Sequence, residues 1–333
     1  MRTTLCDRLN IDVPIIQAAM NGAVGPELAA AVSEAGGLGM LAFWRAEPHV
    51  LREQIRRTRT LTRRPFGVNL NIGMPRQDEQ LDVSLEEGVP IISLFWGDPS
   101  PFIARAHEGG AIVLHTSASA SEARRVVDDG VDVVVAQGWE AGGHVRGTIA
   151  TLPLVPAVVN AVAPTPVVAA GGIADGRGLA AALSLGADGV WIGTRFLASK
   201  EAAIHPRYQE LVLKATEEDT FYGDLFDIGW PDAPHRTLRN KSVEDWEAAG
   251  RPPPGQRPGE GEVVATSPVR GELVRYSAYT VANDTQGDID ALSMWAGQSV
   301  GLVSSIKSAA DIVADILEEA RSTLRRLSNK IDT

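Results

Sequence analysis

The sequence lacks the features that mark several large classes of protein. Its one cysteine, Cys6, rules out an internal disulfide and any metal site built from several cysteines. No run of about 18 uninterrupted apolar residues occurs, so no membrane-spanning helix is expected. The first residues lack the apolar core of a secretory signal peptide. With the single cysteine, these absences predict a cytoplasmic protein.

Positive charge is also scarce. The chain has 31 Lys and Arg against 42 Asp and Glu, for a net charge of −11 at pH 7. Nucleic-acid binding demands basic patches that neutralise phosphates, so a nucleic-acid partner is disfavoured. The sequence contains neither the HExxH motif of a zinc enzyme nor the GK[ST] of a triphosphate-binding loop. We therefore expect no metal centre and no nucleoside triphosphate.

What the chain does contain, as far as Phe196, is a repeated pattern of helix, glycine and apolar strand. Examples are LEEGVPIISLF, HEGGAIVLHT and DDGVDVVVAQ. Glycine adopts at little cost the left-handed conformation that ends a helix. The apolar runs that follow are typical of strands buried on both faces, as in a parallel sheet.

Eight such strands alternating with helices predict an α/β fold, a (β/α)8 TIM barrel. A doubly wound sheet is the alternative, but no GxGxxG follows the first strand. The predicted strands are Ile15–Ala18, Gly39–Phe43, Phe66–Ile72, Ile91–Trp96, Ala111–Thr116, Val131–Gln137, Pro166–Ala170 and Gly189–Thr194. The predicted helices include Pro26–Ala35, Pro48–Thr62, Ser121–Asp128, Leu152–Val162 and Gly176–Leu185.

The residues beyond 200 differ in character. They begin with a predicted helix over Lys200–Ala215, continue through an irregular aromatic stretch, and include the Pro- and Gly-rich loop Arg251–Glu262. We predict a barrel over 1–200, a mostly helical lid over 201–298, and a C-terminal helix within 299–333 from the periodicity of Ser299–Leu327. The lid's aromatic residues are candidates either for a substrate pocket or for ordinary core: Phe221, Tyr222, Trp230, Trp246, Tyr276, Tyr279 and Trp295.

Two glycine-rich loops predict a phosphate site. In a TIM barrel the loops after the strands form the catalytic face, and those after the last two strands commonly bind phosphate. AAGGIADG supplies two glycines and a helix start near Asp175, while GTRF adds further amides, the Thr194 hydroxyl and the Arg195 charge. Backbone N–H groups and a helix N-terminus together attract an anion.

The loop QGWEAGGH contains the candidate catalytic residue, His144. An imidazole takes or gives a proton near neutral pH, and the two preceding glycines allow the ring to approach a flat ligand. A lone histidine is more often structural, and His115, at the end of an earlier strand, is the weaker alternative. Glu140 is expected to orient the loop through hydrogen bonds.

Several longer motifs are similar to those of the nitronate monooxygenase family: IIQAAMNGAVGPELAAAVSEAGGLGML, FGVNL, AQGWEAGGHVRG, AAGGIADGRGLAAALSLGADGVWIGTRFLAS and WAGQSVGL. The resemblance spans most of the chain and implies a TIM barrel with an inserted helical domain and noncovalently bound FMN. It places His144 at the family's active-site histidine. It also implies that the cofactor contacts Ala18, Ala19, Met20, Asn69, Gln137, Gly142, Gly143, Ala170, Gly171, Gly172, Gly193, Thr194 and Gln298.

The function implied by the resemblance is oxidation of alkyl nitronates by O2 to a carbonyl compound and nitrite. His144 would bind the nitro oxygens or take the α-proton of a neutral nitroalkane. FMN-dependent NAD(P)H oxidoreductases, of the enoyl-acyl-carrier-protein reductase or quinone reductase type, share the EAGGH motif and stand as the alternative. A flavin-binding protein without turnover is a further alternative. The sequence does not indicate an oligomeric state.

Overall fold

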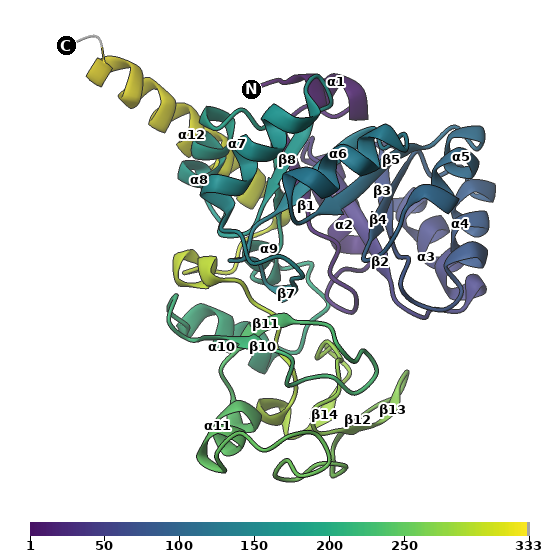
Figure 1. The fold of residues 1–333 in the computed structure, drawn as a ribbon, viewed down its shortest axis with the longest axis vertical. Helices are drawn as coiled ribbons and strands as arrows, with labels where there is room; N and C mark the ends of the chain where they lie inside the picture. Colours follow the sequence, from purple (N-terminus) through teal and green to yellow (C-terminus); the bar gives the residue numbers. More distant parts are fainter. Residues whose placement is uncertain (332–333) are drawn as a thin grey trace.

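The computed structural model describes residues 1–331, and its central feature is a parallel barrel (Figure 1). The sheet order is β1-β9-β8-β6-β5-β4-β3-β2. Ile16 in β1 forms a parallel bridge with Leu38, just before β2, which joins the two ends of the sheet. The predicted TIM barrel is thereby confirmed. Its strands are β1 (Ile15–Gln17), β2 (Gly39–Phe43), β3 (Phe66–Asn71), β4 (Ile91–Phe95), β5 (Ile112–Ser117), β6 (Val133–Gln137), β8 (Val167–Ala170) and β9 (Gly189–Ile192).

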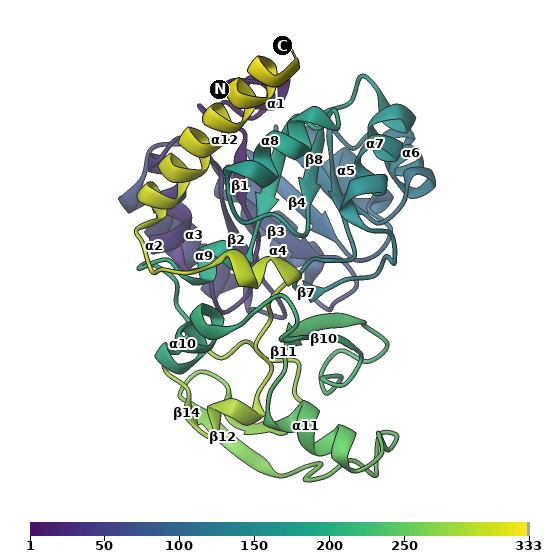
Figure 2. The ribbon, with the colours of Figure 1, turned by 90° about the vertical axis from the view of Figure 1, so that its left-hand side faces the viewer.

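Helices cover the outside of the barrel. The final helix, α12 (Ala309–Ile331), packs against α8 and α2 and so completes the outer ring (Figure 2). Gly88, Gly110 and Gly130 end three of the helical repeats with positive φ angles, as the repeated pattern predicts. The other barrel helices are α2 (Pro26–Glu34), α3 (Pro48–Leu61), α4 (Gln77–Glu86), α5 (Ser100–Glu108), α6 (Ala120–Asp128), α7 (Thr151–Val162), α8 (Gly176–Ser184) and the short α9 (Thr194–Leu197).

Alternation along the strands divides the barrel into two apolar layers. On β6, Val134 and Ala136 pack in the layer beneath the helices, while Val133 and Val135 belong to the cluster inside the barrel. The N-terminal helix α1 (Thr4–Leu9) adds Leu5, Cys6 and Leu9 to the inner cluster. One end of the barrel is therefore filled by apolar side chains. A ligand site can form only at the other end, where the strands have their carboxyl ends.

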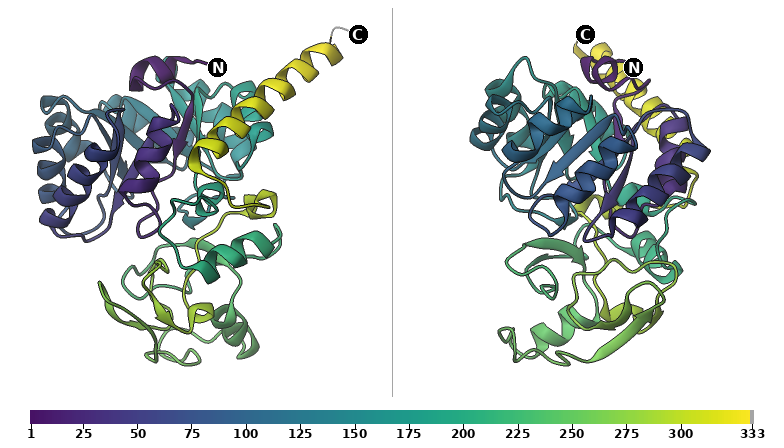
Figure 3. Two further views of the ribbon diagram at one scale, coloured as in Figure 1. Left: turned by 180° about the vertical axis from the view of Figure 1, so that it is seen from behind. Right: turned by 90° about the vertical axis from the view of Figure 1, so that its right-hand side faces the viewer.

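Residues 201–298 form a cap over that other end (Figures 1 and 3). The prediction of a mostly helical lid is wrong. Within 201–298, all of which the structure describes, the two α-helices are α10 (Pro206–Lys214) and α11 (Lys241–Ala248). The rest is built around short antiparallel strands and turns, because β-rich stretches such as TFYG and VVATS pair with the strands that follow them in the sequence. These strands are β10 (Thr220–Gly223), β11 (His235–Leu238), β12 (Val263–Ser267), β13 (Gly271–Val274) and β14 (Gln286–Gly287).

Two predicted helices begin later than expected. Helix α10 starts at Pro206 rather than Lys200, because Lys200 bonds to the backbone of Lys307 and Ile204 bridges to Ala282. The C-terminal helix starts at Ala309 rather than Ser299, after the 3₁₀ turn η2 (Gln298–Leu302). Tertiary backbone pairing thus overrides local helical periodicity at both points. In residues 1–331, none of the helices is long and apolar enough to cross a membrane.

Candidate functional site

A cavity, partly open to solvent, lies between the carboxyl ends of the strands and the cap. Among the described residues that line it, none is Lys, Arg, Asp or Glu. Gln298 does not line it, although Gly297 and Ser299 do. The lining includes His144 and the other predicted cofactor residues: Ala18, Ala19, Met20, Asn69, Gln137, Gly142, Gly143, Ala170, Gly171, Gly172, Gly193 and Thr194.

The glycine loops after β8 and β9 form one wall. Gly171 and Gly172 have φ angles of +95° and +71°, which side chains rarely adopt. A Cβ atom at Gly171 would also lie 2.9 Å from the Gly138 carbonyl oxygen. Thr194, the first residue of α9, accepts a hydrogen bond at Oγ1 from the Gly297 N–H (2.9 Å), which leaves its own O–H free to donate. The wall is therefore made of backbone and small groups, as a phosphate cradle requires.

His144 lies on the two-residue strand β7 (Gly143–His144), which the sequence did not reveal. β7 pairs antiparallel with β11 of the cap, so that His144 is opposite His235. The Gln137 amide donates a hydrogen bond to the His144 carbonyl oxygen (3.2 Å). The imidazole stacks on the Trp230 ring with centroids 3.9 Å apart and a 28° angle between the planes. A strand pair and an aromatic stack therefore fix the histidine.

The environment of His144 keeps its ring neutral. Burial away from water, with a smaller contribution from the neighbouring His235, lowers the pKa of His144 well below 6.5. Its Nε2 atom is buried and has no hydrogen-bond partner within the part of the chain that the structure describes. A buried polar atom without a partner is rare and suits an atom that contacts a ligand.

The other sequence candidates lie away from the cavity or support it. His115 is not in the lining, because Leu114 and Thr116, its neighbours on β5, face the inside of the barrel. Glu140 accepts hydrogen bonds from Thr151 N (2.9 Å) and Thr151 Oγ1 (3.0 Å), so it orients the loop as predicted. Arg195 is buried outside the lining, and burial lowers its pKa.

Sequence reasoning missed part of the lining. Asn71 shares a strand face with Asn69, and this two-residue spacing was a usable signal. Trp44 follows β2 and also lines the cavity. Its indole N–H is buried and has no hydrogen-bond partner among residues 1–331. Of the cap aromatics proposed for the pocket, Trp230 and Trp295 line it and the other five do not. The contacts of these two residues run across long sequence separations, so no local pattern indicates them.

Ser299 also lines the cavity, within the letters GQSVG. These letters match the GxSxG of a nucleophile elbow, which requires a sharp turn between a strand and a helix. Here the serine lies in η2, which follows no strand of the barrel. Among the described residues, no cluster of three or more His, Cys, Asp or Glu is placed to hold a metal ion.

Fold and cavity define a TIM-barrel protein with a capped site at the carboxyl ends of its strands. The family model for nitronate monooxygenase matches residues 2–319, and the chain belongs to that family. It is a flavin-dependent oxidoreductase.

Three relatives illustrate the range of this similarity. FabK from Thermotoga maritima superposes with a TM-score of 0.86 at 37% identity, covering 99% of each chain. Nitroalkane oxidase from Streptomyces ansochromogenes gives a TM-score of 0.80 at 30% identity, covering 98% of this chain and 100% of the other. The (3aS,4S,5R,7aS)-5-hydroxy-7a-methyl-1-oxo-octahydro-1H-indene-4-carboxyl-CoA dehydrogenase of Mycobacterium tuberculosis is 31% identical, covering 100% of this chain and 99% of the relative.

Proposed function

We propose that the protein binds FMN in this cavity and oxidises alkyl nitronates, or the parent nitroalkanes, with O2 to a carbonyl compound and nitrite. The observation that carries the proposal is the neutral imidazole of His144, a residue that lines the same cavity as the glycine loops and whose Nε2 has no hydrogen-bond partner among residues 1–331. Family membership supports the substrate class.

The residues present fit a flavin with a single phosphate. Gly171, Gly172 and Gly193 would hold the phosphate through backbone amides, with the Thr194 hydroxyl as a further donor. A Cβ at Gly193 would already be 3.4 Å from the Ala18 Cβ and 3.5 Å from the Met20 sulfur, so the glycine keeps this wall open to a ligand. When bound, the flavin would supply the electron-accepting chemistry.

The task of His144 is to handle a proton. Its neutral Nε2 can accept the α-proton of a nitroalkane, and burial keeps the ring available as a base at physiological pH. A preformed nitronate has already lost that proton, so here the ring serves to bind the nitro oxygens. The Trp230 stack and the β7 strand hold the ring in one orientation, which favours proton transfer.

A second candidate is an FMN-dependent reductase or dehydrogenase that exchanges hydride between NAD(P)H and a neutral substrate such as an acyl thioester. The specific observation in its favour is the uncharged lining, because a buried anion such as a nitronate is costly without a cation. The relative from Mycobacterium tuberculosis, named as a carboxyl-CoA dehydrogenase, supports a thioester.

Anaerobic spectroscopy separates the candidates. Propane-2-nitronate should bleach the flavin, and admission of O2 should restore the colour and release nitrite, whereas NADH and NADPH should leave the spectrum unchanged. Bleaching by NAD(P)H but not by the nitronate would favour the reductase. If neither compound bleaches the flavin, a non-catalytic flavoprotein is favoured. Denaturation should release FMN, and release of FAD alone would contradict the cofactor assignment.

A further inference from the structure

A single turn of the cap covers His144. This turn, Leu225–Trp230, ends with the tryptophan whose ring stacks on the imidazole. Inside the turn, the Trp230 N–H donates to the Asp227 carbonyl oxygen (2.9 Å). The position of the indole over His144 therefore depends on what holds Leu225 and Asp227, together with the backbone pairing of Ile228 with Tyr276 and Ala278.

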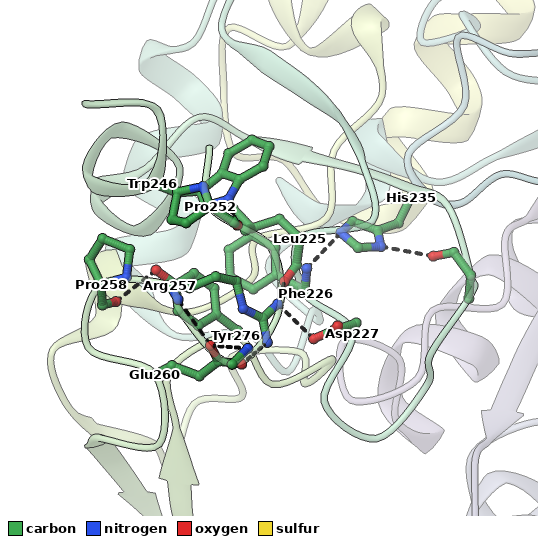
Figure 4. Close-up of polar contacts among 12 residues, drawn as sticks. Leu225, Phe226, Asp227, His235, Trp246, Pro252, Arg257, Pro258, Glu260 and Tyr276 are labelled. Atoms are coloured by element: carbon green, nitrogen blue, oxygen red, sulfur yellow. Dashed lines mark hydrogen bonds and ion pairs between the residues drawn. The ribbon is translucent and has the colours of Figure 1, made fainter. Parts of the chain in front are cut away.

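Arg257 holds both of these residues (Figure 4). Its side chain is 3% exposed. Nη1 donates to the Leu225 carbonyl oxygen (2.9 Å) and to Asp227 Oδ1 (2.8 Å), while Nη2 pairs with Glu260. The guanidinium carbon lies 4.5 Å from the centre of the Tyr276 ring. The planar fork of arginine suits such a hub, because one group bonds several acceptors in fixed directions.

His235 supports the same turn from the opposite side (Figure 4). Its Nε2 accepts the Phe226 N–H (3.2 Å), so Nδ1 carries the proton and donates to the Ala233 carbonyl oxygen (3.0 Å). Both nitrogens are engaged, and burial lowers the pKa of His235. This ring is therefore held neutral beside His144 and does not relay its proton.

We propose that Arg257, a residue outside the cavity, is a positioning residue for His144. By fixing Leu225 and Asp227 it places the Trp230 ring, and that ring orients the imidazole and excludes water from it. The effect on turnover rests on the proposed role of His144. The effect on the imidazole itself is a property of the protein without substrate.

The protonation of His144 reports this positioning directly. The groups that face its ring are His235 from β11, Trp96 after β4, and Trp230 and Trp295 from the cap. Of these, His235 is the one ionisable group, and its two hydrogen bonds keep it neutral with the proton on Nδ1. A rise in the pKa of His144 would therefore signal entry of water as the Trp230 stack loosens.

The test compares two buried arginines of the cap. Arg275 is 8% exposed and pairs with Asp245, outside the Leu225–Trp230 turn. Arg257→Met and the control Arg275→Met both remove a buried cation and its ion pair. We expect NMR titration of ¹³C-labelled histidines to show the His144 pKa rising toward 6.5 in Arg257→Met alone. We also expect kcat to fall by up to about 10²-fold in that variant and to change by less than about twofold in the control.

Trp230 provides the second arm if Arg257→Met folds poorly. Trp230→Leu leaves the Arg257 contacts in place and should reproduce the rise in the His144 pKa, while Trp230→Phe, which keeps an aromatic stack, should restore most of the wild-type titration. An unchanged His144 titration in folded Arg257→Met or in Trp230→Leu, or an equal shift in Arg275→Met, would overturn the proposal. If the shift occurs but no nitronate is oxidised, the positioning stands and the proposed function fails.

Discussion

Two walls of the cavity differ in the chemical groups that they present to a ligand. The barrel wall formed by the loops after β8 and β9 offers backbone amides and glycines, at Gly171, Gly172 and Gly193, whereas the cap wall offers the large rings of Trp230 and Trp295. A backbone wall recognises a ligand by leaving space, so it fails when a side chain is added. A wall of side chains works through orientation and exclusion of water, so it fails when a ring is removed. This difference predicts which substitutions affect cofactor and which affect catalysis.

His144 belongs to the barrel sequence but is held by the cap, and its removal should give the largest effect. We expect His144→Ala to retain flavin and to lose turnover by on the order of 10²–10⁴-fold, because the proton-transfer group is gone. Steady-state rates and the flavin spectrum measure the two properties. A neutral nitroalkane should lose more rate than a preformed nitronate. Wild-type rates on both forms would show that His144 is not catalytic.

Burial lowers the pKa of both His115 and His144, but only His144 lines the cavity. Burial, partly offset by the nearby Glu122 charge, lowers the pKa of His115 to about 4, yet this ring faces away from the cavity. Between pH 6.5 and 4 the unfolded chain binds the proton first, so stability should fall as the pH is lowered through this window. His115→Gln should remove about 3 kcal/mol of that loss by pH 4 and leave the rate at neutral pH largely unchanged. Urea unfolding at several pH values provides the measurement, and an unaltered pH slope would contradict it.

On the barrel wall, a side chain at Gly172 should expel the cofactor. Gly172→Val places a side chain at a φ of +71°, and Gly110→Val is the matched control, at a φ of +79° on the barrel's outside with nothing within 4 Å of its Cβ. Both should lose about 1–3 kcal/mol of stability from backbone strain. Flavin content per protein should fall in the Gly172 variant alone. Equal flavin content in the two variants would remove Gly172 from the cradle.

The barrel wall was predictable from sequence because its determinants are local. A strand, a glycine pair and a helix start lie within ten residues in AAGGIADGRG, and each of the eight predicted strands appears with its ends shifted by two residues or fewer. The resemblance to the family supplied the remaining lining of that wall.

The cap wall could not be predicted in the same way. Trp230 meets His144 across more than eighty residues, and the Pro- and Gly-rich loop Arg251–Glu262, expected to be irregular, does lack helix and strand yet contains the Arg257 hub. Nothing in its composition indicates a partner. Strand β7 formed because β11 of the cap offered an edge to pair with, which is a tertiary effect.

The smallest expected effect comes from a contact that joins the two walls. Arg45, after β2, donates from Nη2 to the Gly229 carbonyl oxygen of the cap (2.6 Å), with its guanidinium carbon 5.4 Å from the centre of the Trp44 ring. The side chain is exposed, so water replaces much of the hydrogen bond that the substitution removes. The contact therefore contributes only about 1 kcal/mol to holding the cap against the barrel. Arg45→Gln should therefore raise KM by less than about tenfold and leave kcat unchanged, since the Trp230 stack is held by Arg257. Arg76→Gln is the matched control, because Arg76 is also an exposed arginine with positive φ but pairs with Glu47 of the barrel domain and not with the cap. If both variants raise KM equally, the contact between Arg45 and the cap does not contribute to substrate binding.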